Sequence, residues 1–411
     1  MSDIQKDAEQ RAPQQQKEAD LNPNRPRTPD QLPPKTAASR FQLNIAHDKA
    51  APKKFSGELD RESGHFHGEG VLVYVDGSKY DGHFSRGVRE GFGTYHGTDG
   101  SRYEGSWQDD KYHGSGSMYF PGGNNFAGTW VNGIISGHGR LSFVNGDSYE
   151  GNWQNNQMYG DGTYFFANGD SYRGSWRNDK RHGVGTMTFI TSDGSSEEVY
   201  DGEWVDGEME GYGTYTLSDG GKFEGDWQSS KMQGRGTFSY ADGKIYVGDW
   251  ADDLRHGFGV LTYPSGDKYE GQWDTGKPHG RGRYVYASGD VFDGEWCDAK
   301  KKGKGSMRFV TGDYFEGEWV DDEASGFGFC EYADGSRYEG MWTSDKRWGQ
   351  GKMTVGAECY EGDWADNKRD GKGILRLANG SVLSGLWKAG RLRQTIDFKL
   401  PDGSIWNDVE I

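Results

Sequence analysis

The chain has 411 residues, of which 32% are hydrophobic, 14% are aromatic and 67 are glycine. This hydrophobic fraction is low for one large globular core, and the glycines lack the Gly-X-Y period of collagen. A net charge of −17 disfavours nucleic acid and anionic lipid as partners. No apolar run reaches about 18 residues, so we expect no transmembrane helix.

Residues 1–54 hold seven of the eleven prolines and neither Gly nor Trp. Bulky apolar side chains are too few to offset the entropy of ordering, so we predict a disordered Pro/Gln-rich tail over 1–54. Ten Lys or Arg against seven Asp or Glu give this tail a charge of +3, which leaves −20 for the remainder. The stretch FQLNIAHD (41–48) could dock locally, and partner binding and a solvated leader both stay open. Residues 1–20 have no apolar segment of a secretory signal, so we expect a cytoplasmic protein.

From Phe55 onward one string recurs, an aromatic residue followed by x-Gly-x-Trp. It reads YEGSW at 103–107, YEGNW at 149–153 and YEGQW at 269–273, and thirteen of the fifteen tryptophans occupy its last position. The first two of its fifteen units end on Leu59 and Phe84 instead. The central glycine falls at 57, 82, 105, 128, 151, 174, 202, 225, 248, 271, 294, 317, 340, 362 and 385. A period of 22 or 23 residues repeated this often indicates a repeat protein.

A Gly-x-Gly signature follows most of these strings, and Asn-Gly or Asp-Gly turns separate the units. Such dipeptides favour tight β-hairpins. Because side chains alternate along a strand, Tyr103, Gly105 and Trp107 share one face. We therefore expect the glycine to leave a hollow for a ring from a neighbouring strand, so that successive hairpins stack. One unit is longer, and we interpret TSDGSSEEV (191–199) as a lengthened hairpin loop.

These residues resemble the MORN (membrane occupation and recognition nexus) repeat family, whose motif runs Tyr-x-Gly-x-Trp, a turn, then His-Gly-x-Gly. The stretch YEGQWDTGKPHGRG (269–282) fits this motif throughout, and the resemblance covers residues 55 to about 390 in fifteen units. It implies an all-β fold, an elongated single-layered twisted antiparallel sheet of stacked hairpins with a groove of aromatics. Departures are Phe for Tyr at 126, 223, 292 and 315, and Leu383 in the last unit.

Two sets of side chains are candidates for binding partners. The aromatic groove would be lined by Tyr103, Trp107, Tyr149, Trp153, Tyr172, Trp176, Tyr269, Trp273, Tyr338 and Trp342. The opposite face carries acidic pairs, which include Glu224, Asp226, Glu316, Glu318, Glu361 and Asp363. The acidic face is either a plain solvated surface, a docking surface that attracts a basic partner electrostatically, or a weak divalent-ion surface.

The chain shows no motif of a catalytic or cofactor site. Five histidines precede a glycine of the second signature, at 67, 113, 182, 256 and 279, but repeats about 10 Å apart cannot bring two of them to one Zn²⁺. We assign them stacking or turn roles and expect no metal, no cofactor and no enzyme. Cys297, Cys330 and Cys359 lie far apart in sequence, as expected of reduced thiols.

Residues 391–411 leave the repeat pattern and are interpreted as a C-terminal cap, or as an edge that pairs with a second copy in a homo-oligomer. The resemblance implies a non-enzymatic scaffold for protein–protein interaction in the flagellar (radial spoke or axoneme) or cortical cytoskeleton. Its partners would be other cytoskeletal or flagellar proteins, in the cytoplasm, cilium or flagellum axoneme, and not nucleic acid. The alternative is a phospholipid-associated membrane tether, which the net negative charge disfavours.

Overall fold

A computed structural model describes residues 50–191, 194–401 and 404. Most of the tail predicted over 1–54, and the end of the segment 391–411, lie outside the described residues. The described residues form strands, turns and bends, and none of them forms a helix that could cross a membrane.

The described residues divide into two compact units, one ending at Gln233 and the other starting at Gly234. In the first unit the strands are β1 (Pro52–Leu59), β2 (Phe66–Tyr74), β3 (Lys79–Ser85), β4 (Val88–His96), β5 (Arg102–Gln108), β6 (Lys111–Tyr119), β7 (Asn125–Val131), β8 (Ile134–Ser142), β9 (Ser148–Gln154), β10 (Gln157–Phe165), β11 (Ser171–Arg177), β12 (Lys180–Ile190), β13 (Glu197–Val205), β14 (Glu208–Thr216) and β15 (Lys222–Gln228). Strand β16 (Lys231–Ser239) spans the boundary. In the second unit they are β17 (Ile245–Ala251), β18 (Leu254–Thr262), β19 (Lys268–Asp274), β20 (Lys277–Val285), β21 (Val291–Cys297), β22 (Lys300–Arg308), β23 (Tyr314–Val320), β24 (Glu323–Glu331), β25 (Arg337–Thr343), β26 (Lys346–Val355), β27 (Glu358–Ala365), β28 (Lys368–Arg376), β29 (Val382–Lys388) and β30 (Arg391–Lys399).

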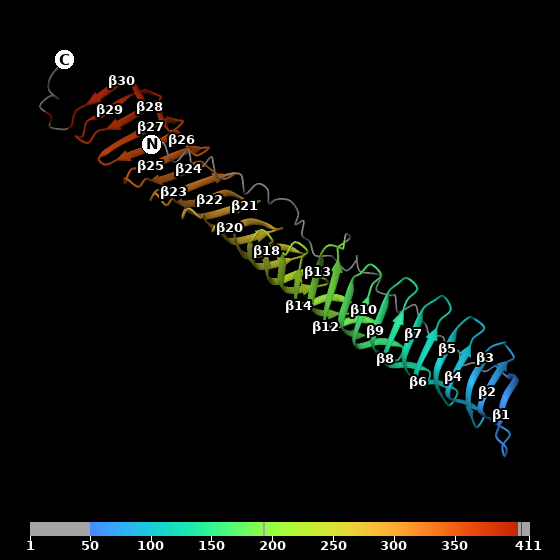
Figure 1. Ribbon diagram of the computed structural model, residues 1–411. Helices are drawn as coiled ribbons and strands as arrows, with labels where there is room; N and C mark the ends of the chain where they lie inside the picture. The colour runs from blue at the N-terminus through green and yellow to red at the C-terminus, as the bar shows by residue number, and fades with distance from the viewer. Residues whose placement is uncertain (1–49, 192–193, 402–403, 405–411) are drawn as a thin grey trace. The chain divides into compact units, whose positions relative to one another are not determined.

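Within each unit, strands that are neighbours in sequence pair antiparallel in a single layer of hairpins (Figure 1). The predicted all-β fold of stacked hairpins is confirmed. Strand β1 begins at Pro52, three residues before the expected start of the repeats at Phe55.

The hairpin of β5 and β6 shows how one repeat is built. The two central glycines, Gly105 and Gly116, lie directly opposite each other, and a bulge between Gly105 and Trp107 brings Trp107 opposite Tyr112. The strands are joined by Asp109 and Asp110 with φ values of 47° and 62°. Two successive left-handed residues make the tight turn whose twist matches that of the strands.

The Asn-Gly and Asp-Gly dipeptides form hairpin turns between successive repeats, as predicted, at the other end of the strands from the two-residue turns. In the turn after β8 the amide of Gly146 donates to the carbonyl of Phe143 at 3.0 Å, and Gly146 has a φ of 95°. This is a three-residue turn with a glycine in the left-handed region. The predicted loop at 191–199 is shorter than expected, because β12 runs to Ile190 and β13 starts at Glu197. The insertion therefore lengthens the strands as well as the loop.

Candidate interaction surface

In most repeats the tyrosine or phenylalanine that begins the string lies flat over a glycine pair. A Cβ atom on Gly116 would lie 2.2 Å from the hydroxyl oxygen of Tyr103, so the ring occupies the space that a side chain would fill. The hydroxyl of Tyr103 donates to the carbonyl of Ser106 at 2.9 Å. Its ring is completely buried. The hollow expected beside the central glycine therefore exists, but the ring that fills it, Tyr103, belongs to the same strand as Gly105 and not to a neighbouring strand as predicted.

Each tryptophan joins one repeat to the next. Trp107 meets Tyr103 edge-on at 5.3 Å within its own repeat, and it meets Tyr80 of the preceding repeat edge-on at 5.0 Å. Its indole N–H donates to the carbonyl of Gly93 at 3.0 Å, which satisfies the polar atom of a buried ring. The same ring contacts recur along both units.

The ten aromatic residues predicted to line a groove all lie in this core. Their relative exposures are at most 9%, and burial raises the pKa of the Tyr338 hydroxyl to about 12. Because their faces contact one another and the glycine backbone, we assign these residues to packing. Partner binding through them stays a prediction. The ten are Tyr103, Trp107, Tyr149, Trp153, Tyr172, Trp176, Tyr269, Trp273, Tyr338 and Trp342.

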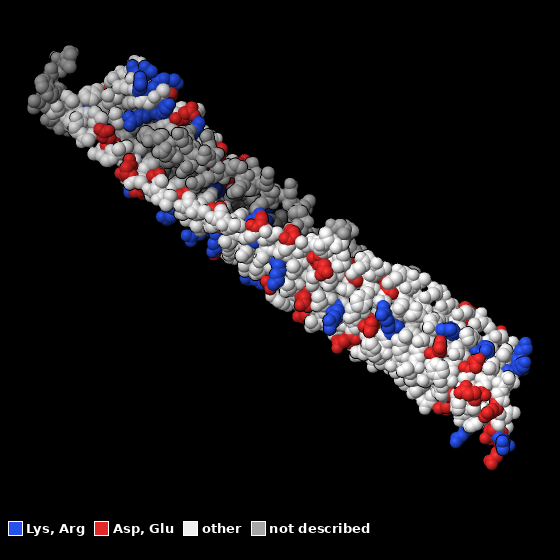
Figure 2. Space-filling model, viewed as in Figure 1, with Lys and Arg blue, Asp and Glu red and all other residues white. Residues whose placement is uncertain are grey.

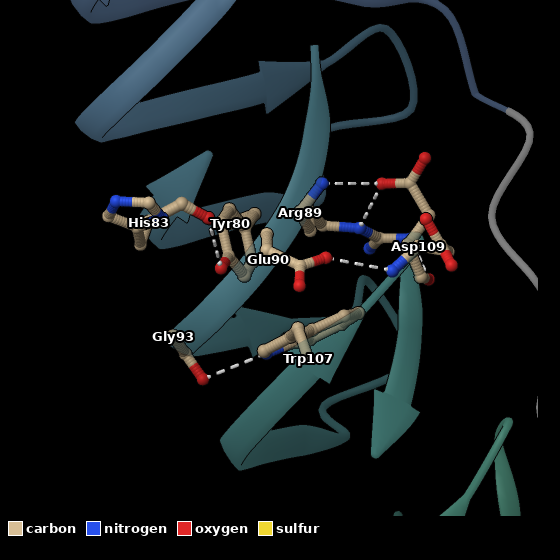
Figure 3. A network of polar contacts seen from close by, with 8 residues as sticks. Tyr80, His83, Arg89, Glu90, Gly93, Trp107 and Asp109 are labelled. Carbon is tan, nitrogen blue, oxygen red and sulfur yellow. Dashed lines mark hydrogen bonds and ion pairs between the residues drawn. The ribbon is translucent and has the colours of Figure 1, made fainter. Parts of the chain in front are cut away.

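Cations cover several of these tryptophans, which the sequence analysis did not anticipate. Figure 3 shows Arg89 between the repeats, with its guanidinium carbon 4.3 Å from the centre of the Trp107 ring. The backbone amide and the Nε of Arg89 both donate to Asp110 Oδ1, at 2.9 and 3.1 Å. The guanidinium also donates to the carbonyl of Asp110 at 2.9 Å. Side chains at the equivalent position do the same over other tryptophans, and these are Arg181, Arg255, Lys301 and Arg347.

These cations are held away from water. Burial lowers the pKa of the Arg181 guanidinium to about 10, and it also lowers the pKa of the Lys301 ammonium. Arg181 donates to the carbonyl of Gly207 at 2.8 Å, so the buried charge has a partner in the next turn. We therefore assign this row to the cohesion of the repeats and not to the capture of an anion.

A row of side-chain hydrogen bonds, which we name the turn ladder, runs along the two-residue turns. The second turn residue accepts a hydrogen bond from a backbone amide of the preceding repeat, as Asn156 does from Ile135 at 2.8 Å and Asp179 from Met158 at 2.8 Å. Its other members are Asp110, Ser230, Asp322, Asp345 and Asn367. The sequence signal was present, because Asp, Asn or Ser follows most strings two or three residues after the tryptophan.

The residue between the central glycine and the tryptophan has a role of its own in the bulge. Asp249 accepts from the amide of Phe258 at 2.8 Å, and Asp363 accepts from the amide of Lys372 at 2.7 Å. Glu203 and Gln272 make the same contact in their repeats. We name these side chains the bulge acceptors. They stabilise a strand that contains a glycine with positive φ.

The six acidic residues predicted for the outer face lie there, and none of them is buried. Asp363 is a bulge acceptor, Glu224 pairs with Lys222 at 2.8 Å, and Glu316 accepts from the Tyr314 hydroxyl at 2.8 Å. The six residues are Glu224, Asp226, Glu316, Glu318, Glu361 and Asp363. Part of the acidic row thus stabilises the fold, and its use as an electrostatic docking surface for a basic partner stays a prediction. Acidic and basic side chains are interspersed on the visible surface (Figure 2).

The histidine position before the second signature also serves a turn. His113 Nδ1 accepts from the amide of Asn132 at 3.5 Å, and Glu90 does the same for Asp109 at 3.1 Å. Glu210 and Asp370 make this contact in their repeats. We name these side chains the turn acceptors. Among the described residues, no group of three or more His, Cys, Asp or Glu is placed to hold a metal ion.

Two surface features were missed by the sequence analysis. The last strands are basic, with eight Lys or Arg against two Asp between Lys368 and Lys399, a net charge of +6 in a chain of −17. Figure 2 shows these basic side chains gathered at the strands β28 to β30. The second feature is an exposed apolar cluster on the outer face around Phe327, Met341 and Trp348.

The geometry defines a class of protein, an array of β-hairpin repeats that stack through a ladder of tyrosine and tryptophan rings. The profile of the MORN repeat matches fourteen segments, at residues 62–79, 80–102, 103–125, 126–148, 149–171, 172–194, 200–222, 223–245, 246–268, 269–291, 292–314, 315–337, 338–354 and 360–382. The chain therefore belongs to the MORN repeat family.

A search of curated protein sequences found no match. Among solved structures, the TCP domain of SAS-4 (dCPAP) from Drosophila melanogaster, in complex with a proline-rich motif of Ana2 (dSTIL), is 12% identical with a TM-score of 0.22. The match covers 43% of this chain and 81% of that domain. A streptogramin B lyase is 11% identical with a TM-score of 0.12, over 71% of this chain and 88% of the lyase. TM-scores this low carry no argument about this chain.

Proposed function

We propose that the chain is a non-enzymatic scaffold that holds partner proteins, set in the flagellar (radial spoke or axoneme) or cortical cytoskeleton. One observation carries the proposal: the repeated residues are buried and the varied residues are exposed. The position between the two glycines of the second signature points to the outer face. It holds Glu69, Phe92, Ser115, His138, Asp161, Val184, Tyr212, Arg235, Phe258, Arg281, Lys304, Phe327, Gln350 and Lys372, and all of them are exposed. A constant core with a varied face suits a protein that presents different contacts along its length.

The setting is tested in the native cell. The chain is tagged at its own locus, imaged against axonemal and cortical markers, and used for proximity labelling. We expect co-localisation with one of these structures and a reproducible set of labelled cytoskeletal or flagellar proteins. A uniform cytosolic distribution without specific neighbours would contradict the proposal.

We further propose that two copies associate through β30. All nine residues of this strand are exposed, including Leu392, Ile396 and Phe398, and an unpaired strand edge is a template for a second chain. An antiparallel pairing centred on Thr395 places Arg393 opposite Asp397 of the second copy. Leu392 then lies opposite Phe398, so the strand is self-complementary in charge and in apolar contact.

Light scattering tests this pairing. The full chain should have twice the mass of 45.8 kDa. Arg393→Asp should give the single mass because like charges face each other, and the exchange Arg393→Asp with Asp397→Arg should restore the double mass. The same mass for the wild-type chain and both variants would contradict this register.

A phospholipid-associated tether is the second candidate function, and the basic strands β28 to β30 favour it. Their net charge of +6 lies beside exposed Leu392, Ile396 and Phe398, a combination that suits an anionic surface. We expect sedimentation of the full chain with phosphatidylserine vesicles, and its loss in Arg391→Glu with Arg393→Glu. Equal sedimentation with neutral vesicles, or none with anionic ones, would count against the tether.

A further inference from the structure

An apolar cluster breaks the polar pattern of the outer face in the second unit. Phe327 and Met341 lie directly opposite each other on β24 and β25, with relative exposures of 52% and 41%. Trp348 on β26 is 48% exposed, and a Cβ on the next residue, Gly349, would lie 3.5 Å from the Met341 Cβ. Phe329, two residues beyond Phe327, faces the same way. We name these four residues the apolar patch.

Two members of the apolar patch occupy positions that elsewhere serve the fold. Met341 stands where Asp249, Gln272 and Asp363 are bulge acceptors, and a thioether is only a weak acceptor. Trp348 stands where Glu90 and other side chains are turn acceptors, but an indole N–H only donates. Both positions therefore exchange a hydrogen bond that supports the repeat for an exposed apolar side chain. Burial in the core explains neither exchange, because Trp348 and Met341 are both exposed side chains.

Carboxylates surround the patch. Phe329 has Glu316 directly opposite on β23 and Glu339 directly opposite on β25. Glu318, which is exposed, lies on the Phe327 side of β23, with its carboxylate beside Gly326.

Two of the nearby cations are already paired. Arg337 contacts Glu331 at 3.0 Å, and Lys346 contacts Asp366 at 3.3 Å. Lys352 lies opposite Glu339, and Lys304 lies opposite Glu318. The patch is thus apolar at its centre, and the three carboxylates Glu316, Glu318 and Glu339 outnumber the two lysines at its rim.

We propose that the apolar patch is a docking site for a segment of another protein in which apolar side chains alternate with Lys or Arg. Large apolar and aromatic side chains at the centre of a surface act as anchors, and a charged rim selects the partner by complementarity. The contiguous exposed rings are the kind of surface that marks a protein interface. The inference rests on the proposed scaffold function and names one site and one partner chemistry for it.

Defined peptides test the chemistry. A labelled amphipathic peptide of Leu and Lys and a matched peptide of Leu and Glu are titrated with the full chain and followed by fluorescence anisotropy. We expect binding of the Lys peptide, weaker binding as salt rises, and no binding of the Glu peptide. Equal binding of both peptides would overturn the proposal.

Variants that copy other repeats test the site. Met341→Gln with Trp348→His restores the acceptors found at the same positions in the units of Gln272 and His113. We expect an affinity for the Lys peptide at least about tenfold lower, with a melting temperature that does not fall. The matched control is Phe92→Ser, since Phe92 is a ring that is even more exposed and faces Ser106 instead of an apolar residue. An unchanged affinity, a lower melting temperature in the double variant, or an equal loss in the control would each overturn the proposal.

Proximity labelling in the native cell separates this inference from the scaffold itself. If the double variant loses a labelled neighbour that carries a basic and apolar segment, and that segment binds the wild-type chain, the site is supported. If the wild-type chain and the double variant label the same neighbours, the proposed docking site is wrong and the scaffold proposal is unaffected. If the wild-type chain labels none, the scaffold proposal fails. A photo-cross-linker at position 348 that reacts only with residues 1–49 of the chain would assign the patch to the tail and overturn the proposal.

Discussion

At the scale of single residues, the glycine pairs decide how closely the rings approach the backbone. Gly105 and Gly116 face each other across two strands, and the ring of Tyr103 lies over both. A Cβ on Gly105 would lie 2.4 Å from the Cα of Gly116, so the contact involves backbone that cannot rotate away. Glycine is therefore required here for close approach, and not for its freedom in φ.

Gly105→Ala should lower the free energy of unfolding by about 1–3 kcal/mol, the usual range for overpacking a core. Denaturant melts of the full chain measure the change. Ser106→Ala, on the outer face of the same strand, should stay within about 0.5 kcal/mol. Equal melts for the two variants would show that the ring does not need the glycine pair.

Asp179 in the turn ladder gives the stability a defined dependence on pH. Burial raises the pKa of its carboxyl group, and the hydrogen bonds from Met158 and Gln157 offset this only in part. Folding therefore favours the neutral carboxyl of Asp179, and ionising this group costs more free energy in the folded state than in the unfolded state. Stability from this group is fully present below its unfolded pKa of about 4 and is lost as the pH rises through the folded pKa.

Asp179→Asn should raise the melting temperature at neutral pH, because Asn accepts the same bond, as Asn156 does in the preceding turn. The gain should shrink as the pH falls toward about 4, where the wild-type carboxyl is neutral too. Asp370→Asn is the control of opposite sign. Hydrogen bonds from Ala389 and Lys388 lower the pKa of Asp370, so its loss should destabilise at neutral pH and matter less in acid. Parallel pH profiles for the two variants would contradict both assignments.

At the scale of the hairpin, neighbouring repeats are held by their turns as well as by their rings. Asp110 accepts from the amide and the guanidinium of Arg89, and the turn amide of Asp110 donates back to the carbonyl of Arg89 at 3.2 Å. Arg89 in turn covers the ring of Trp107. One turn therefore fixes the strand, the cation and the ring of two successive repeats.

Asp110→Ala should destabilise the chain by about 1–3 kcal/mol, because it leaves the nearly buried Arg89 without its carboxylate. Asp109→Ala is the matched control, because it also places alanine at a positive φ in the same turn. The hydrogen bonds of Arg89 described above are made by Asp110 and not by Asp109. Thermal melts of both variants measure the difference. A loss as large in the control would assign the effect to turn strain alone.

At the scale of the whole molecule, stability is a sum of contacts between successive hairpins. A hairpin inside a unit is packed on both sides, whereas β1 and β30 are exposed along most of their length. We expect hydrogen exchange measured by mass spectrometry to be fastest in β1 and β30, and slow in strands such as β9 and β23. Uniform exchange along the chain would contradict nearest-neighbour stability.

Much of the fold could be predicted from the sequence, and much of the surface could not. The spacing of the glycines located every hairpin, and the alternation of Tyr103, Gly105 and Trp107 located the face that carries the rings. The hydrogen bonds of the turn ladder were not predicted from the sequence, because each of them joins residues 20 or 21 positions apart. Similarly, Asp363 is a surface acid in the sequence but a bulge acceptor in the fold.

The sequence by itself determined the period, the antiparallel hairpins and the buried face, because these follow from local alternation and from turns that only Gly, Asn or Asp adopt easily. Only the tertiary structure decided that these rings are buried against one another and against the glycine backbone. It also decided which outward side chains support the fold and which, such as Met341 and Trp348, are left exposed. The reason is physical: burial and hydrogen-bond partners depend on the repeat that lies alongside, and a pattern read within one repeat does not contain its neighbour.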